Sequence, residues 1–129
     1  MNRILVEVSV GELLDKISIL EIKQEKIKDL EKLKFINDEH SILKDQLNKN
    51  VSSDEKLNNM FKSLKEINSR LWVIEDNKRL CEKNSDFTES FIKLSRDVHF
   101  LNDDRAKIKL EINTHTGSKI KEIKEYVKY

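Results

Sequence analysis

Acidic residues at helical spacing are the side chains of this sequence that could most readily do chemistry. Glu12 and Asp15 lie three positions apart. Glu21 and Glu25 lie four apart, so each pair would share one face of a helix. Carboxylates gathered from facing helices can hold magnesium, as in the all-helical nucleotide pyrophosphohydrolases, so one hypothesis is a metal-dependent hydrolase of a phosphorylated small molecule. Lysines interleave with these acids at ion-pair spacing, however, and an exposed lattice of charges explains them without a metal.

Two basic residues occupy positions where the surrounding pattern calls for an apolar side chain. Arg105 and Lys78 each fall in a stripe of apolar residues, so each must reach water, pair with an acid or line a polar cavity. Glu75, Asp76 and Asp103 are the candidate partners of both cations, and Arg105 must have either an acidic partner or a bound anion. With a structural partner, Arg105→Met should be neutral or stabilising, whereas removal of the acid should cost roughly 3 to 5 kcal/mol.

Other kinds of site find less support. Arg105 and Lys109, four positions apart, could hold a phosphate or carboxylate if both pointed into a pocket. The three histidines are far apart and none stands at zinc-site spacing from Cys81, so we expect no metal and no cofactor. Cys81 ends an apolar stripe and is interpreted as a buried, inert thiol. His40 interrupts another stripe and is interpreted as a hydrogen-bonded core histidine.

The elements that must position these residues are helices. The sequence has no proline and only two glycines, Gly11 and Gly117, which suits long helices and deprives sheets of their usual turns. Ser9 followed by Glu12 forms a capping box, and the apolar residues after it are so numerous that the first helix should be buried on more than one side. The sequence therefore predicts an all-α protein.

Changes in the apolar pattern divide the chain into four helices. A shift of phase places a break near Asp29, which would cap the second helix. Ser53 is expected to cap the third helix, and Asp86 with Glu89 to form a capping box for the fourth. The apolar stripe of the third helix alternates steps of three and four, which is a heptad register. Its members are Leu57, Met60, Leu64, Ile67, Leu71, Ile74, Lys78 and Cys81.

A short loop between the third and fourth helices should fold them into a long antiparallel, coiled-coil-like hairpin. The first two helices can form a second hairpin that covers it. The predicted fold is thus a four-helix bundle built from two helical hairpins, in a single domain over residues 1–129. A short N-terminal arm, residues 1–8, should pack on the bundle, and residues 114–129 should form a C-terminal tail.

Composition limits the classes of partner. Lys plus Arg number 25 against 24 Asp plus Glu, and a net charge of +1 offers no field for recruiting nucleic acid or an anionic membrane. Glutamates interrupt the lysine-rich end of the chain, so a nucleic-acid partner is disfavoured. The first apolar run is too short for a signal peptide or a membrane span. A lone cysteine fits a reducing compartment, and we expect a cytoplasmic protein.

Several ordered blocks are familiar. "VSVGELLDKISILEIK", "LWVIEDNKR", "FIKLSRDVHFLNDDRAKIKLEIN" and "GSKIKEIKEY" resemble an uncharacterised family of small bacterial and phage proteins, a domain of unknown function. The resemblance implies a stand-alone helical protein and lends no activity. The family tends to show a glutamate pair near its end, where this chain has Ile123 between Glu122 and Lys124. The polar positions to which the blocks point are Lys16, Glu21, Glu75, Asp76, Arg79, Arg96, Asp103, Arg105, Lys109 and Asn113.

Taken together, these features favour a non-enzymatic interaction module. A charged network would fix the register of the helices, and another face would bind a protein partner or a second copy, giving a homodimer. Trp72 and Phe100, large side chains beside polar neighbours, are the expected partner surface, although both could equally be core residues. The hydrolase remains the alternative.

Overall fold

The computed structural model describes residues 1–129 and contains helices but no strand, which confirms the all-α prediction. The helices are joined by short connections. They are α1 (Val10–Lys26), α2 (Leu30–Asn50), α3 (Glu55–Lys83) and α4 (Glu89–Thr116).

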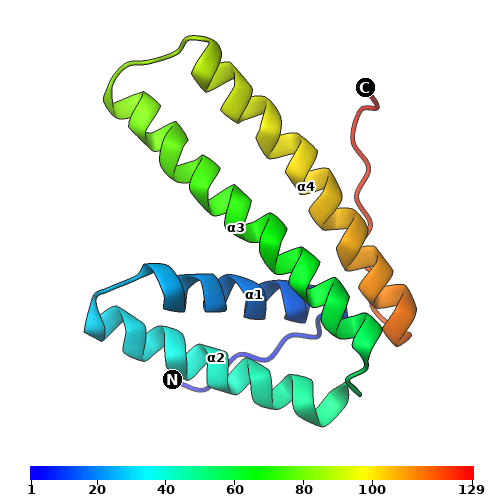
Figure 1. Ribbon diagram of the computed structural model, residues 1–129. Coiled ribbons are helices and arrows are strands. Elements are labelled where there is room, and N and C mark those ends of the chain that lie inside the picture. Colours follow the sequence, from blue (N-terminus) through cyan, green and yellow to red (C-terminus); the bar gives the residue numbers. More distant parts are fainter.

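The four helices form two hairpins that cross near one end (Figure 1). Helix α1 lies at the crossing and packs against all three other helices, whereas the backbone of α2 comes close only to that of α1. The far end of the α3–α4 hairpin extends away from α1 and α2 (Figure 1). The arrangement is therefore more open than four helices running side by side, and α1 is its centre.

Side-chain caps explain where the first two helices begin. Ser9 Oγ accepts a hydrogen bond from the backbone N–H of Glu12 at 3.0 Å, and Asp29 Oδ1 accepts one from Lys32 at 3.0 Å. Each bond satisfies an N–H that lacks a partner within its helix. The predicted break at Asp29 is confirmed.

The caps of the last two helices differ from the prediction. Asp54, not Ser53, caps α3, and its Oδ1 accepts from the N–H of Leu57 at 2.7 Å. Thr88, not Asp86, is the N-cap of α4, and it makes no side-chain cap bond. Asp86 instead accepts hydrogen bonds from the N–H and hydroxyl of Thr88, because the chain turns tightly before the helix starts.

The apolar core lies where the two hairpins meet. Leu14, Leu57, Leu64 and Ile112 form one buried cluster, with contributions from α1, α3 and α4. Helix α1 is buried on several sides, as predicted, whereas α2 has no fully buried residue. Every position of the predicted α3 stripe is buried or half-buried, so the heptad assignment agrees with the structure.

Both ends of the chain are non-helical. Residues 1–8 are exposed, so the prediction that this arm packs on the bundle is wrong, and its apolar side chains stay in solvent. Helix α4 continues three residues into the predicted tail and ends at Gly117, whose left-handed φ of 64° turns the chain back. The C-terminal tail, residues 118–129, then runs along α4 (Figure 1).

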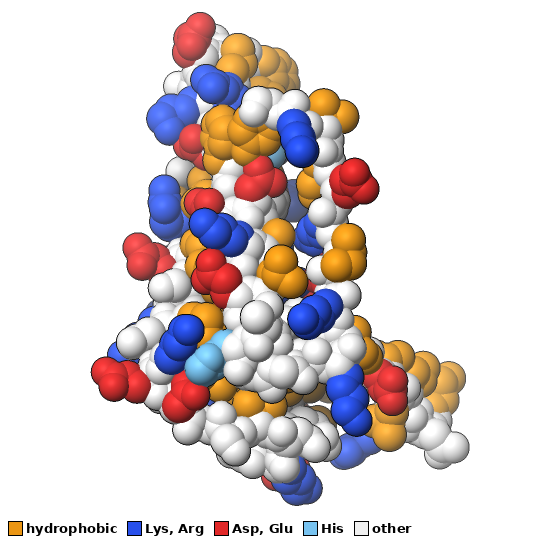
Figure 2. Space-filling view, turned by 90° about the vertical axis from the view of Figure 1, so that its right-hand side faces the viewer, with side chains coloured by type: hydrophobic (Ala, Val, Ile, Leu, Met, Phe, Trp, Pro, Cys, Tyr) orange, Lys and Arg blue, Asp and Glu red, His pale blue; other side chains and the backbone are white.

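The face formed by α4 and the tail carries charges of both signs with apolar groups between them (Figure 2). None of the four helices combines the length and apolar character that a membrane crossing requires.

Candidate functional site

A buried ion pair links the first helix to the last. The Asp15 side chain is only 3% exposed and accepts two hydrogen bonds from Arg105, 2.9 Å from Nε and 2.5 Å from Nη2. This two-pronged geometry is the strongest form of a guanidinium–carboxylate contact. The prediction that Arg105 needs an acidic partner is confirmed, but naming Glu75, Asp76 or Asp103 was wrong. Those acids are exposed, whereas α1 crosses directly over Arg105.

Polar side chains of α1 and α3 complete the surroundings of Asp15. Asn68 Nδ2 donates to Asp15 Oδ1 at 2.9 Å and to Ser18 Oγ at 2.8 Å. The Ser18 hydroxyl donates in turn to the backbone carbonyl of Asp15 at 2.7 Å. Asn68 and Ser18 are both buried, so this chain of bonds fixes α3 against α1 in one register.

Lys109, one turn after Arg105, is a second buried cation at the same contact. Its side chain is 7% exposed, and its Nζ donates to Glu12 at 2.7 Å and to Glu122 of the tail at 2.9 Å. Asp15 Oδ2 lies 3.9 Å away. Two cations and three carboxylates thus join α1, α4 and the tail, and we call these five residues the charged network.

The charged network shifts the pKa values of Asp15, Arg105, Lys109 and Glu122 in the direction that favours their charged forms. Burial alone would raise the pKa of Asp15, but hydrogen bonds from Arg105 and Asn68 and the nearby positive charges hold it below its usual value. Burial alone would lower the pKa of Lys109, yet Glu12, Glu122 and Asp15 raise it. The hydrogen bond to Lys109 lowers the pKa of Glu122. The contacts of the charged network thus favour the ionised forms of Asp15, Lys109 and Glu122.

A close approach of two backbones holds the start of α1 against α4. The N–H of Gly11 donates to Asn113 Oδ1 at 2.7 Å, and Asn113 is almost fully buried. A Cβ at position 11 would lie 2.6 Å from the backbone oxygen of Lys109, so only glycine fits there. The N–H of the preceding residue, Val10, donates to Ser118 Oγ at 3.2 Å. Ser118 is the first residue of the tail.

A second ion cluster holds the other end of α1. Glu21 Oε2 lies 3.1 Å from His40 Nε2 of α2, and Glu21 Oε1 lies 3.5 Å from Lys65 Nζ of α3. Lys65 also donates to Glu25 at 2.8 Å, and this bond raises the pKa of Lys65. His40 is half-buried and paired, as expected for a hydrogen-bonded core histidine. This cluster ties α2 and α3 to α1.

The polar positions singled out in the sequence thus separate into different places. Arg105, Lys109 and Asn113 meet at α1, and Glu21 lies in the second cluster. The remaining six are exposed. Lys16 pairs with Glu12, Arg96 lies over the Phe100 ring, Asp103 accepts from the Tyr129 hydroxyl, and Glu75, Asp76 and Arg79 make no ion pair.

Asp15, Ser18 and Asn68 were not among the polar positions chosen from the sequence. Asp15 lies between the buried Leu14 and Ile17 on α1, so a carboxylate within an apolar surface wider than one stripe was the available signal. No local pattern marks Asn68, because it lies beside the α3 stripe and its hydrogen-bond partners are on α1, far away in the sequence.

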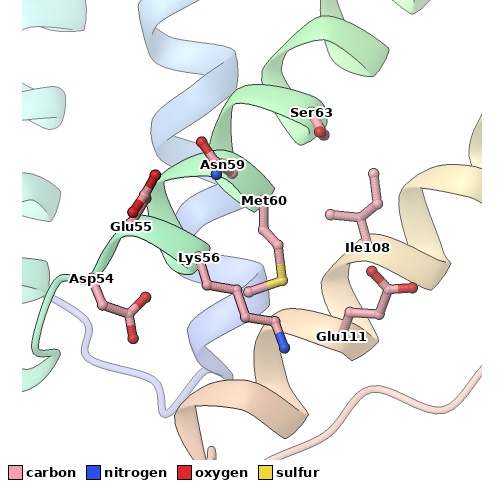
Figure 3. A pocket seen from close by; sticks show the side chains of 8 residues that line it. All are labelled: Asp54, Glu55, Lys56, Asn59, Met60, Ser63, Ile108 and Glu111. Carbon is pink, nitrogen blue, oxygen red and sulfur yellow. The ribbon is translucent and has the colours of Figure 1, made fainter.

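The acid pairs proposed for metal binding are each occupied by a lysine. Glu12 and Asp15 lie around Lys109 Nζ, and Glu21 and Glu25 lie around Lys65 Nζ. No group of three or more His, Cys, Asp or Glu side chains could hold a metal ion. An open hollow between α3 and α4 contains acids, but the Glu111 carboxylate lies across it from those of Asp54 and Glu55 (Figure 3). The hydrolase hypothesis thus lacks the geometry it requires.

In a comparison with protein families, the chain matches the model of a family of unknown function, DUF6165, over residues 4–128. The chain belongs to this family. The match agrees with the resemblance to an uncharacterised family and, like it, brings no activity. No curated protein and no solved structure matches the chain.

Within this member of DUF6165, every buried polar side-chain atom has a hydrogen-bond partner. The charged network holds α1 against α4, and the hydrogen bonds of Asn68 to Asp15 and Ser18 add α3 in the same register.

Proposed function

We propose that this protein is a non-enzymatic interaction module that acts as a homodimer, with the outer side of α4 and the tail as its contact surface. One observation carries the proposal: exposed apolar side chains follow α4 outside its seam with α3 and continue onto the tail. Figure 2, which views the molecule from the side of α4 and the tail, shows apolar side chains between the charged ones on this face. We call this set the α4–tail face; its members are Ile92, Phe100, Leu110, Ile123 and Val127.

The size and charge of the α4–tail face suit a second copy of the chain. Helix α4 has 28 residues and is about 42 Å long, enough to supply the roughly 800 Å² per partner that a stable interface buries. In a two-fold dimer the same face meets itself, so it must be self-complementary. Charges of both signs are interspersed along this face, which avoids the repulsion of two like-charged surfaces (Figure 2).

The contacts of α4 with α3 and α1 favour a rigid scaffold for this surface. The regular α3 stripe favours coiled-coil-like packing against α4, and the charged network fixes α4 to α1. Phe100, one of the two residues expected at a partner surface, lies on the α4–tail face, while Trp72 is half-buried on α3. A cytoplasmic location is part of the proposal, because the buried Cys81 thiol is free.

Light scattering on purified protein tests the dimer. We expect a mass twice the 15.3 kDa of one chain at high micromolar concentration. Val127→Asp should weaken the dimer about tenfold or more without affecting the fold, since Val127 is 91% exposed in one chain. Val6→Asp is the matched control, because Val6 is 74% exposed on the opposite terminal segment. A wild-type mass equal to one chain, or equal loss in both variants, would refute the proposal.

A further inference from the structure

The last part of α2 and the start of α3 are neighbours in the sequence but are not packed backbone to backbone. The backbone of α2 comes close to that of α1 and not to that of α3. The interhelical hydrogen bonds of α2 join Asn37 to Gln24 and His40 to Glu21, and both partners lie on α1. Only side chains therefore fill the space between α2 and α3, which we call the α2–α3 cleft.

The filling is incomplete and leaves a cavity of about 100 Å³ with apolar walls. Leu14 of α1 and Leu57 of α3, which are 3% and 4% exposed, belong to the buried core cluster. Leu47, Val51 and Phe61 pack against that cluster and are half-buried. Apolar side chains beside an unfilled space lack contacts that a close-packed core would give them. An apolar group that enters the cavity supplies those contacts.

Exposed polar residues line the mouth of the cavity, and the only charge among them is positive. Lys44 is the one charged residue of the lining, and it makes no ion pair, because the acid nearest to it in sequence, Asp45, pairs with Lys49. Ser53 donates to Asn58 Oδ1 at 3.1 Å, which leaves the Nδ2 group of Asn58 free to donate. Hydrogen-bond donors beside a positive charge suit a carboxylate.

We propose that the α2–α3 cleft binds a small carboxylic acid, with its chain in the cavity and its carboxylate beside Lys44 and Asn58. An apolar cavity of about 150 Å³ holds benzene, so about 100 Å³ suits a chain of about four carbons. The site is independent of the proposed homodimer. Its lining comes from α1, α2, α3 and the connection between α2 and α3, and no residue of α4 or of the tail contributes.

Contacts at both ends of the α2–α3 cleft fix its width. At one end Asp54 caps α3 and lies 2.8 Å from His115 of α4, which holds the connection between α2 and α3 in place. At the other end, one turn beyond Lys44 and Phe61, Glu21 contacts both His40 of α2 and Lys65 of α3. The cleft is thus preformed, so a ligand does not have to order it.

A methyl NMR titration of the whole chain with pentanoate tests the site. We expect the methyl signals of Leu14, Leu47, Val51 and Leu57 to shift and to saturate, whereas those of Leu110, exposed on α4, stay unchanged. Pentanamide and pentylamine keep the chain and change the charge. We expect Kd to be about threefold higher for pentanamide and higher still for pentylamine, since an exposed ion pair contributes a factor of about that size.

Two variants separate the charge from the cavity. Lys44→Met should remove the preference for pentanoate over pentanamide and leave pentanamide binding unchanged. Lys34→Met is the matched control, because Lys34 is an exposed lysine of α2 that does not line the cavity. Val51→Phe should abolish binding of all three probes, because the ring fills the cavity. The extended φ of −131° at Val51 accepts any L-residue without strain.

The outcomes that contradict the proposal are distinct from those that concern the homodimer. Methyl signals that do not saturate, or an equal shift of Leu110, would overturn the site. Pentylamine or pentanamide binding as tightly as pentanoate would overturn the assignment to a carboxylate, and so would a preference for pentanoate that survives in Lys44→Met. A single-chain mass by light scattering would refute the homodimer and leave this site unaffected.

Discussion

Replacing Arg105 by methionine tests which partner of the buried ion pair depends on the other. The sequence alone suggested that Arg105 is the desolvated member, so that its removal would be harmless. The structure reverses this, since Asp15 is 3% exposed and the Arg105 side chain 27% exposed. Arg105→Met therefore leaves a buried carboxylate, whereas Asp15→Asn leaves a guanidinium that can turn to water. We expect the first variant to be the less stable.

The magnitudes follow from what remains around each group. Breaking a buried ion pair from one side costs about 3 to 5 kcal/mol. Asn68 still donates to Asp15 in Arg105→Met, and Lys109 remains 3.9 Å away, so we expect about 3 kcal/mol. Asp15→Asn loses charged hydrogen bonds but strands no buried charge, and should cost about 1.5 kcal/mol. The double variant should cost less than the sum, because it contains neither an unpaired cation nor an unpaired carboxylate.

The dependence on pH gives a second signature. In the wild type Asp15 has a lowered pKa, so its contribution to stability is present above the unfolded-state pKa of about 3.9 and is lost as pH falls through the folded value. In Arg105→Met burial should instead raise the pKa of Asp15. As pH falls, Asp15 becomes protonated and the variant no longer carries an unpaired buried charge, so its loss of stability becomes smaller. The difference in free energy of unfolding should thus be largest near neutral pH and shrink toward about pH 4.

Urea unfolding at one protein concentration, followed by fluorescence of the single tryptophan, Trp72, and by circular dichroism, measures these quantities. A neutral or stabilising Arg105→Met, or a double variant whose cost equals the sum of the single costs, would show that Asp15 does not depend on Arg105. If the difference in free energy of unfolding between the wild type and Arg105→Met stayed constant between pH 7 and pH 4, the electrostatic argument would be contradicted.

Two further predictions concern the contact of α1 with α4 and the end of the tail. Gly11→Ala should destabilise the protein by about 1 to 3 kcal/mol in thermal or urea unfolding, because the added Cβ would lie 2.6 Å from the Lys109 carbonyl oxygen. This cost should exceed the gain from the better helix propensity of alanine. A stabilised variant would disprove this contact. The hydrogen bond to Asp103 raises the pKa of Tyr129, so in a Tyr126→Phe background the tyrosinate absorbance should titrate at lower pH once Asp103→Asn is added. An unchanged titration would place Tyr129 elsewhere.

Local sequence patterns were sufficient to predict the four helices, but they did not predict the capping residue of every helix. The capping interactions of Ser9 and Asp29 and the register of α3 depend on residues within a few positions of one another, and all three agree with the structure. The third and fourth helices each begin with several adjacent residues that can cap, such as Ser53 and Asp54. Which of them accepts the N–H depends on the backbone path of the loop, and a pattern of residue types does not specify that path.

The partner of Arg105 could not be deduced from such patterns, because it depends on the crossing of two hairpins. Heptad spacing gives the side of α4 on which Arg105 lies but not which helix covers that side. With α1 assigned only to cover the hairpin, exposed acids of α3 and α4 such as Glu75 and Asp103 were reasonable partners. Asp15 is brought to Arg105 by the angle between the hairpins, a tertiary property.

The central position of α1 has a consequence for the order of folding. Its polar partners lie far along the chain, with Asn68 separated from Asp15 by 53 residues, Arg105 from Asp15 by 90 and Asn113 from Gly11 by 102. The α1–α2 and α3–α4 hairpins close through much shorter loops, and such local contacts form first. During synthesis α1 must therefore wait, with its buried carboxylate still in water, until most of α4 has emerged from the ribosome. Docking of α1 is thus expected to be the late, rate-limiting event, and it is the step at which a half-made chain is most exposed to aggregation.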